Sequence, residues 1–280
     1  MEPGRGSGAA HRVRPAGPGS AGARVRRRAL APVLSPLAIV AVLVWIVLGG
    51  IYQRLVLWPA SALFPRRRRA LVSAYMRVMA RVIFALLGIG GARAKRCGRV
   101  PTDAPVLMIM NHQSLVDILT LCLVGWPYVP WFVSRRRYGR FVPTIAFCQR
   151  LLGCPIIEPS DRRAALATLE DAARRQDHGI AIFPEGHRTR DGEIGPFHSA
   201  GVELMLRQRA VPVYLVVTDG FWTCRRLVDF VFNIDRIDGR TEVLGPFEPP
   251  GPESVAAFVG EMREKMVGHL HAMRERNGRL

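Results

Sequence analysis

The feature that most constrains the fold is a run of twenty residues, 33–52, that contains no charged side chain. Valine, leucine and isoleucine dominate it, and about twenty helical residues are what crossing ~30 Å of hydrocarbon requires. The run therefore predicts a retained membrane anchor, which either spans the bilayer or re-enters one leaflet. A secretory signal peptide is the alternative, because arginines precede the run, but the run is long for a signal and Arg54 interrupts its exit.

A second apolar stretch, residues 71–90, differs from the first because Arg77 and Arg81 stand four residues apart on one helical face. This pattern predicts a helix that lies in the membrane interface without crossing it. Residues 1–31 are rich in Gly, Ala, Pro and Arg and predict a disordered tail. We therefore expect a tail at 1–31, a membrane anchor with an interfacial helix at 32–97, and a folded domain at 98–280.

The charge of the chain favours anionic partners, since 40 basic and 22 acidic residues give a formal net charge of +18. Nucleic acid is not an expected partner, because the sequence has no finger, basic-zipper or ribonucleoprotein motif. The apolar stretches instead favour an anionic membrane surface. Five widely spaced cysteines without a C-x-x-C pair, and histidines without ligand spacing, predict no metal site.

After Gly98, short β-branched runs alternate with longer helical patterns. This alternation predicts an α/β fold, with a mostly parallel central sheet flanked by helices and preceded by the membrane-associated helices. Strands are predicted at 106–110, 129–133, 154–157, 180–183, 211–217 and 229–233, and helices at 115–124, 138–152, 162–176, 198–209 and 253–273. In such sheets, sites gather where strands end and helices begin.

Two short motifs stand at such points, Asn-His-Gln-Ser-Leu-Val-Asp at 111–117 and Phe-Pro-Glu-Gly-His-Arg at 183–188. His112 follows a predicted strand and Asp117 lies in the first turn of the next helix, so the two side chains meet only if His112 sits in the turn. Asp117 would then hold one ring nitrogen and leave the other to remove a proton from a hydroxyl.

In the second motif, Gly186 allows a sharp loop that presents Glu185 and Arg188, and the planar fork of arginine suits a phosphate. Taken singly, the first motif is equally typical of a capping or surface pair, and the second is equally typical of an ordinary loop salt bridge. Together they resemble the blocks N-H-x-x-x-x-D and F-P-E-G-T-R of the glycerolipid acyltransferase family that includes the 1-acylglycerol-3-phosphate acyltransferases. The resemblance runs from about residue 106 to 217.

The resemblance implies that His112 acts as the base on the acceptor hydroxyl, that Asp117 supports it, and that Glu185 and Arg188 bind the acceptor around the turn at Gly186. It implies a membrane-bound O-acyltransferase domain at 98–280, with a lysophospholipid acceptor, most closely 1-acylglycerol-3-phosphate. The acyl donor would be an acyl-CoA or an acyl carrier protein thioester, and no other cofactor is implied. We expect the active site on the cytoplasmic face, where these donors are.

Two departures from the family pattern bear on the acceptor. His187 stands where the family has threonine, and Pro159 stands where an intermediate block has an arginine that grips the acceptor. Either Arg162 or Arg163 replaces that arginine, or the acceptor is another lysophospholipid or a lyso-ornithine lipid. A non-catalytic lipid-binding scaffold is a further alternative, against which the presence of all four motif side chains argues.

Overall fold

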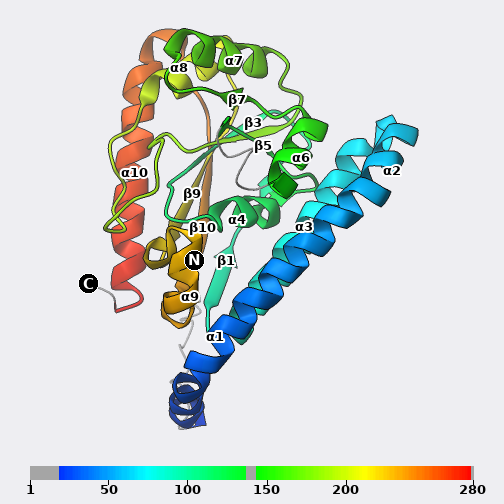
Figure 1. Cartoon of the computed structure of the whole chain (residues 1–280). Coiled ribbons are helices and arrows are strands. Elements are labelled where there is room, and N and C mark those ends of the chain that lie inside the picture. The colour runs from blue at the N-terminus through cyan, green and yellow to red at the C-terminus, as the bar shows by residue number, and fades with distance from the viewer. Residues whose placement is uncertain (1–18, 137–142, 279–280) are drawn as a thin grey trace, which may run out of the picture.

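A computed structural model describes the backbone of residues 19–136 and 143–278, and the side chains of 34–136 and 144–278. A central sheet is flanked by helices, and a long helical hairpin lies along one side of it (Figure 1). The predicted fold class, an α/β fold with a mostly parallel sheet preceded by apolar helices, is confirmed.

The main sheet has six strands, and every neighbouring pair is parallel except β10 with β9. Strands β3, β8 and β9 are buried along their whole length, as continuous apolar runs are when helices cover both faces of a sheet. The order across the sheet is β1 (Arg93–Cys97), β10 (Asp238–Phe247), β9 (Val213–Asp219), β3 (Val106–Met110), β8 (Gly179–Ile182) and β5 (Trp131–Phe132).

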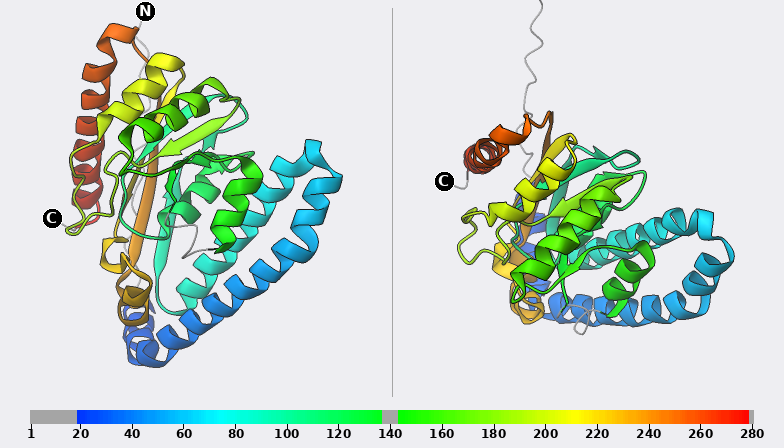
Figure 2. Two further views of the ribbon diagram at one scale, coloured as in Figure 1. Left: turned by 45° about the horizontal axis from the view of Figure 1, so that its top comes forward. Right: turned by 90° about the horizontal axis from the view of Figure 1, so that it is seen from above.

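Five of the helices fall where the sequence predicts them, within two residues at each end, except that residues 138–142 of the predicted helix 138–152 lie outside the described residues. In the α7 helix, the Asp161 carboxylate caps the first turn by accepting a hydrogen bond from Ala164 N at 2.9 Å. Helix α10 runs beside α8 and β9, on the side of the sheet away from the helical hairpin (Figures 1 and 2). The five are α4 (Asp117–Val124), α6 (Pro143–Leu152), α7 (Arg162–Arg174), α8 (Ser199–Gln208) and α10 (Val255–Glu275).

Short elements connect the larger ones. Two-stranded ladders pair β2 (Val100–Pro101) with β4 (Gly125–Trp126), and β6 (Ser134–Arg135) with β7 (Ile156–Ile157). The predicted strand at 154–157 is thus reduced to β7 and does not join the main sheet. Single 3-10 turns occur at Trp222–Cys224, Ile234–Arg236 and Pro252–Ser254.

The prediction of a strand at 229–233 is wrong, because these residues lie in helix α9 (Leu227–Asn233). The Asp229 carboxylate accepts a hydrogen bond from Arg226 N at 2.7 Å and caps the first turn. Phe230 is buried in a cluster that includes Ala38 and Ile39 of the first helix. Packing and capping thus override the β-branched and aromatic composition that favoured a strand.

The N-terminal region forms the two arms of a hairpin. The outgoing arm is α1 (Gly19–Tyr52), a π-helical turn (Gln53–Leu57) and α2 (Trp58–Leu63), and the returning arm is a 3-10 turn (Pro65–Arg67) followed by α3 (Arg68–Ile89). Ser35 Oγ donates a hydrogen bond to Gly90 O at 3.2 Å and ties the base of the hairpin together. Each arm is long and apolar enough to cross a membrane, by length and composition alone.

These elements shift two of the expected domain limits. Helix α1 begins at Gly19, within the segment predicted as a disordered tail, because alanine and arginine favour helix. The rest of that tail, residues 1–18, lies outside the described residues. Strand β1 pairs with β10, so the sheet starts before the expected boundary at residue 98.

The hairpin is fastened to the sheet domain by polar side chains. Gln53 Nε2 donates to Thr144 O of α6 at 2.8 Å. Arg77, which the sequence analysis assigned to the membrane interface, instead turns into the protein: it donates to Gly125 O at 3.3 Å and stacks over the Trp126 ring at 4.7 Å. The prediction for α3 is therefore wrong at Arg77, because the domain supplies acceptors closer than any headgroup.

Candidate active site

The first motif forms a tight turn between the end of β3 and the start of α4. His112 Nδ1 lies 2.8 Å from Asp117 Oδ2, and that oxygen also accepts the backbone N–H groups of Gln113 at 2.7 Å and Ser114 at 2.8 Å. The Asp117 side chain is fully buried. Because the carboxylate accepts the Nδ1 proton, the ring is held in one orientation with Nε2 as the basic nitrogen.

The second motif follows β8, the parallel neighbour of β3, and binds the backbone of the first. The Glu185 carboxylate accepts from His112 N at 2.8 Å and from Gly195 N at 3.0 Å, and Thr189 N donates to His112 O at 2.8 Å. Burial raises the pKa of Glu185 above its ordinary value, although these N–H donors oppose the shift. Glu185 thus holds the histidine in place, and its part in acceptor binding stays a prediction.

Gly186 adopts a backbone conformation that other residues rarely take, with a φ of +67°. A Cβ atom at this position would lie 3.1 Å from His198 Cδ2. The Gly186 carbonyl accepts a hydrogen bond from the Arg135 guanidinium, which fixes the loop from its other side. The predicted sharp turn is therefore present, and Arg135 is a supporting residue that the motif did not reveal.

Arg188 is half-buried, and its guanidinium donates a hydrogen bond to Arg225 O. It lines a cavity of about 380 Å³ together with Glu185, His187 and residues of the loop that follows the motif. A second cavity of about 300 Å³ lies on the other side of Arg135, between β6 and α6. Arg188 and Glu185 thus line the same cavity, and Glu185 also holds the turn that carries His112.

Arg162 and Arg163 are not brought to this site. Both are exposed at the start of α7, and neither lines either cavity. Their proximity to Pro159 in sequence therefore does not bring them to the cavity of Arg188. Among the residues that the structure describes, no group of three or more His, Cys, Asp or Glu side chains gathers as metal ligands do.

Side chains outside the predicted set support the turn that carries His112 and Asp117. Asn111 exchanges two hydrogen bonds with the Thr218 backbone, at 2.8 and 2.9 Å. Gln113 donates to Gly192 O at 3.2 Å and accepts from Phe221 N at 3.1 Å. Both therefore join the turn to the end of β9, a contact that only the tertiary structure reveals.

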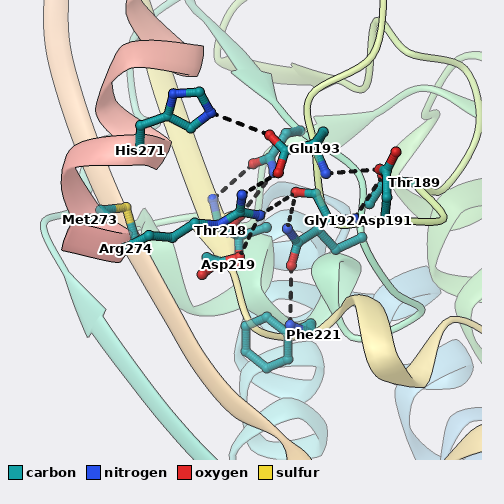
Figure 3. Close-up of polar contacts among 12 residues, drawn as sticks. Thr189, Asp191, Gly192, Glu193, Thr218, Asp219, Phe221, His271, Met273 and Arg274 are labelled. Atoms are coloured by element: carbon teal, nitrogen blue, oxygen red, sulfur yellow. Dashed lines mark hydrogen bonds and ion pairs between the residues drawn. The ribbon is translucent and has the colours of Figure 1, made fainter. Parts of the chain in front are cut away.

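Arg274 of α10 is the centre of the same supporting network (Figure 3). Its guanidinium binds Gly192 O at 2.9 Å, Asp219 Oδ1 at 3.3 Å, and the Glu193 carboxylate. The neighbouring carboxylates raise the pKa of Arg274 against the opposing effect of burial. A helix distant in sequence thus fixes the loop that follows the second motif to the end of β9.

Comparisons with known proteins cover this region. Residues 95–218 match a family model described as Acyltransferase. The chloroplastic 1-acyl-sn-glycerol-3-phosphate acyltransferase BAT2 of Brassica napus is 32% identical over 122 residues, which are 42% of this chain and 34% of that protein. The 1-acyl-sn-glycerol-3-phosphate acyltransferase of Saccharomyces cerevisiae is 27% identical over 173 residues, 59% of this chain and 55% of that protein. The chain thus matches between a third and about half the length of these relatives.

A crystal structure of the 1-acyl-sn-glycerophosphate acyltransferase PlsC from Thermotoga maritima has a similar fold, with a TM-score of 0.57. The comparison covers 84% of this chain and 98% of that chain at 17% sequence identity. The likeness at this identity concerns the fold alone. Taken with the sequence comparisons, it confirms the resemblance that the two motifs predict.

Proposed function

We propose that this chain, whose residues 95–218 form a domain of the Acyltransferase family, transfers a fatty acyl group from a thioester to the hydroxyl of a lysophospholipid, with 1-acylglycerol-3-phosphate as the first acceptor. The observation that carries the proposal is the pair of His112 and a fully buried Asp117 at 2.8 Å. The histidine side chain is 16% exposed, so the pair is rigid at one end and open to a substrate at the other.

The proposed reaction uses His112 as a general base. Nε2 takes the proton from the acceptor hydroxyl while the oxygen attacks the thioester carbonyl, and the Asp117 carboxylate stabilises the imidazolium that forms. When the tetrahedral intermediate collapses, the carbon–sulfur bond breaks and the imidazolium returns the proton to the thiolate. The products are the acylated lipid and the free thiol of coenzyme A or of the acyl carrier protein, and the chain forms no covalent intermediate.

The chemical groups near His112 and Asp117 indicate the class of acceptor and the class of donor. The Arg188 guanidinium lines the cavity next to the catalytic turn, and a guanidinium fork is suited to a phosphate. The donor needs no cofactor beyond its own thioester, because a thioester is already activated toward an alcohol. These observations favour a phosphate-bearing lysolipid over a neutral one.

The hairpin supports a membrane surface as the place of reaction. Exposed apolar side chains recur at helical spacing along the outgoing arm, over roughly 30 Å of helix. The opposite face of the same arm packs on α3 and the domain, as shown by the buried Ala38, Val42 and Gln53. The exposed stripe consists of Leu37, Val40, Val44, Val47, Ile51, Leu55 and Trp58.

This arrangement favours a hairpin that rests in one leaflet over one that crosses. A crossing arm would meet lipid on every side that does not pack on α3, whereas this arm also packs on α6 and α9 of the folded domain. It also favours a retained anchor over a cleaved signal, since cleavage would uncover the core around Ala38 and Phe230. Both ends of the hairpin then face the same side, which we take to be the cytoplasmic face that holds the donors.

The reaction is tested with detergent-purified protein, comparing wild type, His112→Ala and the matched control His269→Ala. His269 of α10 pairs with Glu242 of β10 at 2.8 Å and belongs to neither motif. Acyl-CoA and acyl carrier protein donors are each offered with lysophosphatidic acid, other lysophospholipids and lyso-ornithine lipid. We expect transfer to lysophosphatidic acid by wild type and the control only. If folded wild-type protein is inactive with every combination of donor and acceptor, the result favours a non-catalytic lipid-binding scaffold instead.

Membrane contact is tested by vesicle flotation of Val47→Asp and Leu55→Asp, with Ala167→Asp on the exposed face of α7 as the control. Losing the burial of one such side chain lowers partitioning by about tenfold or more, at roughly 1.5–3 kcal/mol each. We expect the two stripe variants to leave vesicles containing anionic lipid and the control to remain bound. Equal flotation of all three contradicts the proposed orientation.

A further inference from the structure

Arginines from two distant segments meet beside the second motif. Arg188 and Arg190 lie in the loop after β8, whereas Arg225 lies between the 3-10 turn Trp222–Cys224 and α9. All three line the cavity of about 380 Å³ described above. Arg225 falls outside residues 95–218, so the family match does not extend to it.

These guanidiniums lack acidic partners in the part of the chain that the structure describes. No ion pair between a carboxylate and Arg188, Arg190 or Arg225 is present there, and Arg225 Nε is buried without a hydrogen-bond partner. Burial, followed by the charges of Arg190, Arg226 and Arg188, lowers the pKa of Arg225. Crowded cations without a counterion repel one another, so a bound anion would relieve the repulsion.

The carboxylates near the cavity are already engaged. Asp191 accepts hydrogen bonds from Thr189 Oγ1 at 2.8 Å and from Glu193 N at 3.0 Å, and Glu193 is bound by Arg274. Asp229, which also faces Arg225, accepts from Arg226 N at 2.7 Å. The lining therefore carries three arginines and three acids, Glu185, Asp191 and Glu193. None of these acids forms an ion pair with the cavity arginines in the described part of the chain, so the three guanidiniums stay open to an anion.

The cavity is joined directly to the catalytic turn. Two of its lining residues, Glu185 and Thr189, hold the backbone N–H and C=O of His112. Ser114 Oγ donates to Cys224 O and so fixes the residue immediately before Arg225 to the same turn. The cavity arginines and His112 are thus held by one network of hydrogen bonds.

We propose that Arg225, with Arg188 and Arg190, forms a subsite for a substrate phosphate, and that Arg225 supplies the guanidinium which the sequence lacks at Pro159. The inference rests on the proposed acyl transfer and deepens it by naming the group that the site recognises. Arg162 and Arg163, the candidates suggested by their closeness to Pro159, are exposed on α7 and do not line this cavity. The phosphate comes from one of two sources, the phosphomonoester of the acceptor or the 3′-phosphate of coenzyme A.

The test compares Arg225→Gln with Arg226→Gln, a neighbour of the same charge that is exposed and does not line the cavity. Arg225→Lys is included because a lysine keeps the charge but not the bidentate fork. The Arg225 carbonyl, and hence its bond to Arg188, survives each substitution. Thermal unfolding confirms that each variant is folded.

Two readouts are measured. The first is the KM and kcat for lysophosphatidic acid and, separately, for acyl-CoA and acyl carrier protein donors. The second is binding of glycerol 3-phosphate and of adenosine 3′,5′-bisphosphate by calorimetry, which needs no turnover. We expect Arg225→Gln to raise one KM by about 10–100-fold with kcat changed less than about threefold, Arg225→Lys to lie between it and wild type, and Arg226→Gln to match wild type.

The possible outcomes distinguish the two sources of the phosphate, and they distinguish failure of the subsite from failure of the proposed function. A raised KM for lysophosphatidic acid and weaker glycerol 3-phosphate binding assign the subsite to the acceptor; a raised KM for acyl-CoA alone and weaker bisphosphate binding assign it to the donor. Loss of binding in Arg225→Gln, in a protein that transfers no acyl group, upholds the subsite and removes the proposed function. Equal effects of Arg225→Gln and Arg226→Gln, or no effect on either KM or binding, overturn the subsite.

Discussion

Replacing Asp117 by asparagine tests the catalytic pair most directly. The carboxylate oxygen that holds His112 lies 2.8 Å from Nδ1. At an effective dielectric constant of ~20, an imidazolium and a carboxylate at this distance attract by at most about 6 kcal/mol, and about half of that once the charge is spread over the ring. Since ~1.4 kcal/mol is a tenfold change in rate, Asp117→Asn is expected to lower kcat by about 10²–10⁴-fold.

The same variant should fold. The asparagine carbonyl can keep the three hydrogen bonds that Oδ2 accepts, from Nδ1 of His112 and from Gln113 N and Ser114 N. Its NH₂ group then replaces Oδ1, which is buried without a hydrogen-bond partner, at a cost of about 1–3 kcal/mol. We therefore expect a lower unfolding temperature but a native structure, and an acceptor KM within about threefold of wild type.

The assay is steady-state acyl transfer by purified protein in detergent, with Asp161→Asn as the matched control. Asp161 is an exposed cap, and asparagine caps a helix as well as aspartate does, so this control should keep its kcat within about twofold. Adding Asp117→Asn to His112→Ala should lower the residual rate by less than about threefold, because the two act as a unit. A folded Asp117→Asn that keeps more than a tenth of kcat, or a further ~100-fold loss in the double variant, refutes the reasoning.

Three further results are expected. Because burial raises the pKa of Glu185 above 4.5, the folded chain binds this proton more readily than the unfolded chain; the group therefore costs stability near neutral pH, and that cost fades as the pH falls toward 4.5. The difference in unfolding temperature between wild type and Glu185→Gln should accordingly vary over this range, and a difference independent of pH contradicts the assignment. Arg274→Met should lower the free energy of unfolding by about 3–5 kcal/mol in urea titrations, because it breaks the buried ion pair with Asp219, whereas Arg276→Met at an exposed ion pair should cost less than about 1 kcal/mol. Gly186→Ala, at a φ of +67°, should cost about 1–2 kcal/mol and reduce kcat, while Gly251→Ala, which meets nothing within 4 Å, should do neither; equal activity of the two variants contradicts the strain argument.

The strands that carry the motifs could be predicted because their signal is local. The predicted strand 106–110 coincides with β3, and 180–183 overlaps β8, since both are continuous apolar runs in a sheet covered on both faces. The contact between His112 and Asp117 was predictable for the same reason, because a turn followed by a helix start is a short-range geometry.

Strand β1 and helix α9 were not predictable in this way, whereas the other edge strand, β5, lies within the strand predicted at 129–133. Strand β1 is short, mostly exposed and rich in basic residues, and it exists only because it pairs with β10 from the other end of the chain. Residues 229–233 have the composition of a strand, yet the packing of Phe230 and the cap at Asp229 make them helical. Local propensity is a weak signal wherever a distant partner supplies most of the stabilisation.

The sequence by itself determined the α/β class, the apolar N-terminal helices, and the turn that pairs His112 with Asp117, because each depends on residues a few positions apart. Only the tertiary structure decided which side of the outgoing arm is buried, how Gln113 and Arg274 hold the turn, and that Arg225 rather than Arg162 or Arg163 shares the cavity of Arg188. Residues far apart in sequence meet through the order of strands in the sheet, and hydrophobic spacing along the chain does not encode that order.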